Sequence, residues 1–320
     1  MFTLYPSIKS YTCHKLKVDD VHTLHIEECG NPDGAPVLIL HSGPGAGCES
    51  VHKRLFDPEK YRIILFDQRG AGQSTPHASL ENNTTQHLID DIESIREHLN
   101  VSKWFLFGNA WGSALSLLYA EEFPQNVSGM ILNCIFLARE QDINWFYQKG
   151  ANAVFPDHWQ EFINHIPKNE RADLINAYAK RLNNNNDELS RMNAAKHWSL
   201  WQAKCTALQP HHNIIEHFSD PRFAIGLACI ESHYFSNNCF IENNFILSNI
   251  KKIRHIPLFI IHGRYDMICP LENAWQLHES CPSSELMIIR DAGHSLTEPG
   301  VIDALILASK NILHAEPSAC

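Results

Sequence analysis

The sequence predicts an α/β fold in which a mainly parallel sheet is flanked by helices and interrupted by a helical insertion. Short apolar runs alternate with longer amphipathic stretches up to residue 138, and the same alternation returns after residue 250. The 320 residues, 44% of them apolar, can form a full hydrophobic core. We therefore expect a core formed by residues 1–138 and 250–320, with a helical domain at 139–249.

The core elements follow in chain order. Helices are expected at 85–99 and at about 300–313, where apolar residues recur at helical spacing. Strands are expected where short runs are rich in Val, Ile, Leu and Phe. These runs are PVLILH (36–41), YRIILFD (61–67), WFLFG (104–108), VSGMILNCIF (127–136), IPLFIIHG (256–263) and SELMIIRDAGH (284–294).

The strand signal disappears between about residues 140 and 249. Amphipathic stretches rich in Trp, Phe and His take its place, and prolines and a polar run separate them. The separators are Pro156, Pro167, the polar run 183–187, Pro210 and Pro221. This texture predicts a helical insertion in the strand–helix core.

Charge and composition exclude several classes of function. Acidic residues outnumber basic ones by 36 to 26, so the formal net charge is -10 and nucleic acid or anionic membrane partners are not expected. Apolar runs stay well short of the roughly 18 residues of a membrane span, and the first residues lack a secretory pattern, which predicts a cytoplasmic protein. The ten cysteines form no CxxC pair and no HExxH occurs, so no metal or cofactor is expected.

A strand-to-helix turn at 107–113 carries the first chemical signal. The sequence FGNAWGS follows a predicted strand and precedes an apolar helix, which is the context of the GxSxG nucleophile elbow. Its centre is Ala110, which has no nucleophile and no transferable proton. Covalent catalysis at this position is therefore impossible. An ordinary strand-to-helix turn would show the same glycines, so this motif alone leaves both interpretations open.

Three further positions have the order and context of a hydrolase. The loop HSGPGAG (41–47) follows a strand, and its glycines could point backbone N–H groups at a developing oxyanion. Asp266 and His294 each follow a β-type run, in the order elbow, acid, histidine. A carboxylate that orients an imidazole needs such rigid loop ends at the carboxyl edge of a sheet.

With these motifs in place, the sequence resembles the proline iminopeptidase family across nearly the whole chain. The resemblance implies an α/β-hydrolase fold with a helical cap, and a Ser–Asp–His triad that removes N-terminal proline from peptides without metal or cofactor. The motifs that carry it are HSGPGAG, DQRGAGQSTPHASLENNTT, DIESIREHL, GNAWGS, FLAR, ESHYF, HGRYDMICP and AGHS.

The resemblance also implies roles for individual residues. Asp266 would be the acid, His294 the base, and Gly43 and Trp111 the oxyanion donors, with Ala110 at the nucleophile position. The partner would be a peptide with a free N-terminal proline, whose α-amine the family binds with cap carboxylates. The remaining implied binding residues are Glu231 for the amine and Phe136, Phe146 and Phe235 around the proline ring.

The departures from the family pattern cluster at this site. The chain has GNAWGS for GGSWGS, HSGPG for HGGPG, WQA for WEG and LNCIF for LRGIF. Gln202 and Asn133 thus replace one negative and one positive charge, and we expect both near the amine-binding end. An introduced Ser-to-Ala change would leave the other departures unexplained, which favours natural divergence.

Three functional hypotheses remain open from the sequence. The chain is a proline iminopeptidase shown with its nucleophile missing, a natural pseudoenzyme that binds peptides or a protein partner, or a hydrolase with a displaced nucleophile. Ser113 belongs to the motif of active family members and Ser42 lies on the oxyanion loop, so neither is a strong replacement for the missing hydroxyl. The sequence does not define the oligomeric state.

Overall fold

The computed structural model describes residues 1–184, 186–209 and 212–316, so Asn185 and Pro210, both among the predicted separators between helical stretches, lie outside the described residues. The strands form an eight-stranded sheet in the order β1-β2-β4-β3-β5-β6-β7-β8. Pairings from β4 to β8 are parallel, whereas β1 with β2 and β2 with β4 are antiparallel. The strands are β1 (Thr12–Lys17), β2 (Thr23–Gly30), β3 (Ala35–Leu40), β4 (Tyr61–Asp67), β5 (Trp104–Asn109), β6 (Val127–Asn133), β7 (Leu258–Gly263) and β8 (Glu285–Ile289).

The predicted mainly parallel sheet is confirmed, because the six apolar runs correspond to β3 to β8. The hairpin of β1 and β2 was not predicted. Its strands carry His, Lys and Glu between apolar residues, and β1 is largely exposed at the edge of the sheet. An edge strand that buries little apolar surface gives only a weak hydrophobic signal.

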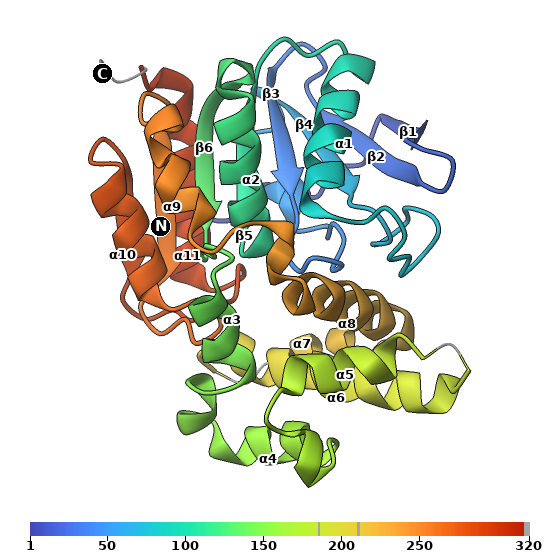
Figure 1. Cartoon of the computed structure of the whole chain (residues 1–320). Helices are drawn as coiled ribbons and strands as arrows, with labels where there is room; N and C mark the ends of the chain where they lie inside the picture. The colour runs from blue at the N-terminus through green and yellow to red at the C-terminus, as the bar shows by residue number, and fades with distance from the viewer. Residues whose placement is uncertain (185, 210–211, 317–320) are drawn as a thin grey trace.

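Successive residues of the central strands face two separate apolar layers. Leu38, Ile64 and Leu106 pack on one face with helices α1 (Thr85–His98) and α2 (Trp111–Glu122). Their strand neighbours Val37 and Ile63 pack with α11 on the other face. Helices α1 and α2 thus lie in front of the sheet and α11 behind it (Figure 1).

The helices of the insertion gather beyond the carboxyl ends of the parallel strands (Figure 1). Helix α8 packs on α5 and α6, and α6 also contacts α4 and α7. Helix α9, which the sequence assigned to the insertion, contacts α2 of the core. The helices are α1 (Thr85–His98), α2 (Trp111–Glu122), α3 (Glu140–Tyr147), α4 (Pro156–Asn164), α5 (Leu174–Leu182), α6 (Glu188–Thr206), α7 (His212–Phe218), α8 (Pro221–Ser236), α9 (Phe245–Asn249), α10 (Leu271–Ser280) and α11 (Pro299–Asn311).

The described helices include none that is long and apolar enough to cross a bilayer. Helix α6 is the longest at 19 residues, but charged and polar side chains interrupt it along its length.

Candidate active site

The turn between β5 and α2 has the strained geometry of a nucleophile elbow. Ala110 has φ of 51° and ψ of -113°, which an L-residue with a Cβ adopts only at a cost. The flanking glycines are sterically required: a Cβ on Gly108 would lie 2.2 Å from the Gly112 carbonyl oxygen, and one on Gly112 would lie 2.0 Å from that of Leu40. The chain therefore keeps a turn that presents its central side chain to the site, although that side chain is a methyl group.

An acid–histidine pair lies at the ends of two neighbouring strands. Asp266 follows β7 and His294 follows β8, and Nδ1 of His294 lies 3.0 and 2.9 Å from the two carboxylate oxygens of Asp266. Although burial disfavours its charge, His294 and the backbone N–H of Cys269 hold the pKa of Asp266 below its usual value. An ionised Asp266 fixes the imidazole so that Nε2 is its free nitrogen, as a general base requires.

The loop after β3 carries Gly43, which the sequence predicts as one of two oxyanion donors. Gly43 has φ of +119°, and a Cβ there would lie 2.5 Å from the backbone nitrogen of Gly45. Only glycine fits this position without strain. The other predicted donor, the N–H of Trp111, is at the first residue of α2, where a helix leaves its N–H groups without intrahelical acceptors.

Hydrogen bonds from the loop after β4 hold the two segments that carry the predicted oxyanion donors. Gln68 donates its backbone N–H to Nε2 of His41 at 3.0 Å and its side-chain amide to the His41 carbonyl at 3.1 Å. Its Oε1 accepts the indole N–H of Trp111 at 2.9 Å. Gln68 thus ties the loop that carries Gly43 to the start of α2.

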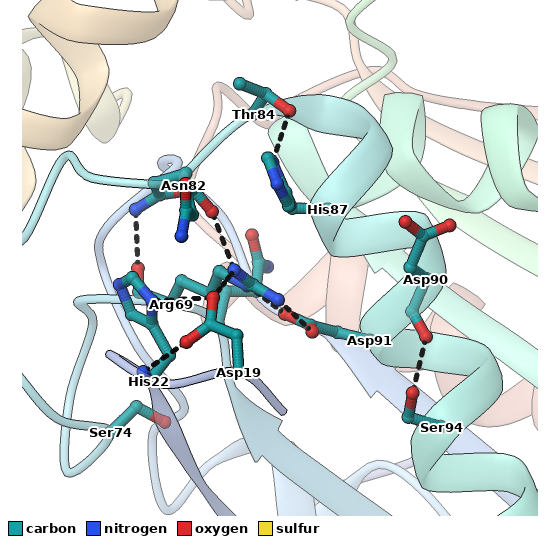
Figure 2. Close-up of polar contacts among 12 residues, drawn as sticks. Asp19, His22, Arg69, Ser74, Asn82, Thr84, His87, Asp90, Asp91 and Ser94 are labelled. Carbon is teal, nitrogen blue, oxygen red and sulfur yellow. Dashed lines mark hydrogen bonds and ion pairs between the residues drawn. The ribbon is translucent and has the colours of Figure 1, made fainter. Parts of the chain in front are cut away.

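A buried ion-pair network in turn anchors that loop (Figure 2). Arg69 makes two hydrogen bonds of 2.7 Å to the carboxylate of Asp91 on α1, and a further one of 2.6 Å to Asp19 in the β1–β2 turn. It also donates to the carbonyl of Asn82 at 2.7 Å. Both Arg69 and Asp91 are almost fully buried, so the guanidinium connects three segments that are distant in sequence.

A cavity of about 520 Å³ lies between the elbow and the helical insertion. The structure brings the sequence-predicted site residues together on its wall, with the exception of Asp266, which lies behind His294. The predicted residues that line the cavity are Gly43, Ala110, Trp111, Phe136, Phe146, Gln202, Glu231, Phe235 and His294.

Glu231 is a buried carboxylate on α8 that faces this cavity. It accepts hydrogen bonds from the indole of Trp198 at 2.6 Å, from the hydroxyl of Tyr147 at 3.2 Å and from the amide of Gln202. Burial raises its pKa to about 8, although these three donors act in the opposite direction. The group therefore gains from a cationic partner in the cavity.

Comparisons with known proteins agree with this geometry. A family model described as alpha/beta hydrolase fold matches residues 35–300. A proline iminopeptidase from Arabidopsis thaliana is 48% identical over 312 residues, which are 97% of this chain and 82% of the relative. One from Xylella fastidiosa is 48% identical over 314 residues, which are 98% of this chain and 100% of the relative. The chain belongs to the proline iminopeptidase family.

Solved structures support the fold alone. A bromoperoxidase from Bacillus anthracis superposes with a TM-score of 0.67 at 16% identity, covering 95% of this chain and 100% of the other. An esterase from Exiguobacterium antarcticum has a TM-score of 0.63 at 20% identity, covering 90% and 96%. The predicted α/β-hydrolase fold and the predicted family are both confirmed.

Aromatic side chains enclose the part of the cavity near Glu231. Rings of Phe136 and Phe235 lie 6.0 Å apart, and Tyr147 lies 5.4 Å from Phe235. Phe146 stacks on Trp201 at 5.1 Å. The sequence did not assign roles to Tyr147 and Trp198, although both donate hydrogen bonds to the carboxylate of Glu231. In the sequence, the one feature that could have indicated a role for Tyr147 is its position next to Phe146, which was predicted to lie at the proline ring.

Asn133 does not lie where we expected it. The sequence placed it with Gln202 at the amine-binding end, but its side chain donates to Oδ1 of Asn109 at 2.7 Å, beneath the elbow. The cause is strand register, since Asn109 at the end of β5 lies directly opposite Asn133 at the end of β6. Two departures from the iminopeptidase motif therefore form one contact, and Gln202 forms another with Glu231.

The hydroxyl of Ser113, beneath the turn, is already engaged in hydrogen bonds. The hydroxyl of Ser113 donates to the Ala110 carbonyl at 2.6 Å and accepts the Phe136 N–H at 3.1 Å, and the residue is fully buried. The Ser113 hydroxyl therefore stabilises the backbone of the elbow. Ser42 lines the cavity on the loop that supplies Gly43.

One group of residues at this site has metal-ligand chemistry. Cys134, Asp266 and His294 place potential ligand atoms within 4.8 Å of one another. Asp266 and His294 are, however, hydrogen-bonded to each other, and burial raises the pKa of the Cys134 thiol well above its usual value, which disfavours the thiolate that binds metal. The geometry favours an acid–histidine pair at this position, and the absence of a metal stays a prediction.

Proposed function

We propose that this protein binds the N-terminal proline of peptides with a free α-amine and does not hydrolyse them through an acyl-enzyme. The observation that carries the proposal is Ala110, which occupies the elbow while Asp266, His294, Gly43 and Trp111 surround it in the arrangement of a hydrolase. Retention of that arrangement supports a binding site descended from an iminopeptidase. Oxyanion donors and binding alone leave a residual rate of roughly 10³ to 10⁴ over water.

Recognition of the amine is proposed for Glu231. Its carboxylate is buried, faces the cavity and lies among aromatic rings that suit a pyrrolidine. Gln202 contributes a neutral amide where the family pattern has a second carboxylate. A charge-assisted hydrogen bond contributes about 1.5–3 kcal/mol against about 1 kcal/mol for a neutral one, so we expect amine binding that is retained but weakened.

The first test is turnover of a proline arylamide together with labelling by a serine-directed phosphonate. The purified protein should show no covalent adduct and only residual turnover, whereas Ala110→Ser should become labelled. His294→Ala in the Ala110→Ser background provides the control, because it removes the base and should abolish labelling. An adduct of the unmodified chain on Ser42 or another serine would contradict the proposal.

A second expected result concerns pH. Below about pH 8 the free protein holds a proton on Glu231, and binding an ammonium group releases it. Affinity for a prolyl peptide should therefore rise by up to about tenfold per pH unit from pH 6 to 8 and then level off. Calorimetric titrations at several pH values measure this, with His294→Ala as a control for the imidazole.

Glu231→Gln should bind more weakly and lose the pH dependence that this carboxyl causes. An affinity that stays constant between pH 6 and 8 in the unmodified protein would exclude Glu231 as the amine anchor. Equal binding of a prolyl peptide and its N-acetylated form would exclude amine recognition altogether.

A further inference from the structure

The amide pair of Asn109 and Asn133 adds a hydrogen-bond donor beside the vacated nucleophile position. Asn109 immediately precedes Ala110, is 7% exposed and lines the cavity. Its Oδ1 accepts the Asn133 amide at 2.7 Å, which fixes the orientation of the side chain. Its Nδ2 makes no hydrogen bond to the described part of the chain, and because Asn109 lines the cavity, this donor is available to a ligand.

Other donors meet at the same wall of the cavity. The N–H of Trp111 at the start of the 12-residue helix α2 and the N–H of Gly43 belong to the oxyanion hole. Nε2 of His294 is the nitrogen left free by the bond of Nδ1 to Asp266. With alanine at position 110, no hydroxyl lone pair opposes a negative charge among these donors.

We infer that the ligand is a free imino or amino acid, whose carboxylate occupies the place where a substrate's acyl group would lie. A carboxylate brings two charged oxygens to these donors and gains from the N-terminus of α2, whereas a peptide carbonyl brings one neutral oxygen. The inference rests on the proposed function for the amine end, which Glu231 binds. The ligand is then a zwitterion that resembles the reaction product. Its ammonium group contacts Glu231, and its carboxylate contacts the donors near position 110.

Calorimetry with three ligands of matched shape tests this inference. Proline carries both groups, prolinamide replaces the carboxylate by a neutral amide, and N-acetylproline keeps the carboxylate but loses the basic amine. Proline should bind at least about tenfold more tightly than prolinamide, as expected when a charged acceptor becomes neutral. N-acetylproline should also bind more weakly than proline.

Two variants of Asn109 test whether its amide donor, rather than the shape of the side chain, binds the carboxylate. Asn109→Gly should reduce the affinity for proline and bring it close to that for prolinamide. Asn109→Asp keeps the shape and can still accept from Asn133, but it places a negative charge beside the carboxylate. It should abolish the preference for proline over prolinamide, and binding of prolinamide shows that the variant is folded.

The outcomes distinguish this inference from the proposed function. Prolinamide binding as tightly as proline, with N-acetylproline still weak, would overturn the carboxylate site and leave amine recognition intact. Proline binding tenfold more weakly than a prolyl peptide would also overturn it. Equal affinity for proline and N-acetylproline would instead contradict the proposed function.

Discussion

The triple variant Ala110→Ser, Asn109→Gly and Gln202→Glu should hydrolyse a proline arylamide with a kcat/KM at least roughly 1000-fold above that of the unmodified chain. The returned hydroxyl would stand on a turn that already has the elbow geometry, in a cavity that His294 of the acid–histidine pair and the two predicted oxyanion residues also line. Loss of a catalytic serine can lower kcat by about 10⁶-fold. The expected gain of roughly 1000-fold is therefore only part of the rate that a catalytic serine can supply.

Ala110→Ser alone should raise kcat/KM much less, by about 10- to 100-fold over the unmodified chain. Asn109 immediately precedes the new hydroxyl and lines the cavity, and in the proposed amine site Gln202 offers a dipole where the family pattern has a charge. Misplacing the scissile carbonyl by about 1 Å can cost on the order of 100-fold. Steady-state kinetics of the single, double and triple variants measure each step.

Adding His294→Ala to the triple variant provides the control, because removal of the base should return the rate to that of the unmodified chain. If Ala110→Ser alone equals the triple variant, Asn109 and Gln202 are neutral substitutions. The case for a remodelled binding site, and with it the role given to Asn109, would then fail.

Much of the fold could be predicted because parallel strands buried on both faces are nearly continuous apolar runs. Loops that follow such strands meet at one edge of the sheet, which is why Ala110, Asp266 and His294 could be assigned to one site before any geometry was known. The exposed hairpin of β1 and β2 gave no comparable signal.

Contacts that depend on strand register could not be predicted. Asn109 and Asn133 are 24 positions apart, and they touch only because β5 and β6 align these two residues. The contact of Gln68 with Trp111 likewise depends on how two loops pack. The sequence named each departure from the family motif, but pairing Asn133 with Gln202 was wrong because charge alone does not specify which neighbour a side chain has.

Replacing Arg69 by methionine should destabilise the protein by about 3–5 kcal/mol, the usual effect of leaving a buried charge without its partner. Burial raises the pKa of Asp91, and the Arg69 guanidinium, through two hydrogen bonds of 2.7 Å, opposes that effect most strongly, with a smaller contribution from His22. Figure 2 shows the same guanidinium reaching Asp19 as well, so its loss frees the loop that holds Gln68. Equilibrium unfolding in urea measures the change.

The double variant Arg69→Met with Asp91→Leu shows whether Arg69→Met loses stability because Asp91 is left without a partner or because the arginine side chain no longer packs there. Removing both charges leaves no unpaired carboxylate at position 91, so most of the lost stability should return. Ligand binding need not recover with it, because neither apolar side chain can hold the loop to Asp19 and Asn82 as the guanidinium does. A double variant as unstable as Arg69→Met would show that packing around the long arginine side chain, rather than compensation of Asp91, stabilises this part of the fold. A loss below about 1 kcal/mol in Arg69→Met would show that the network contributes no more than an exposed ion pair.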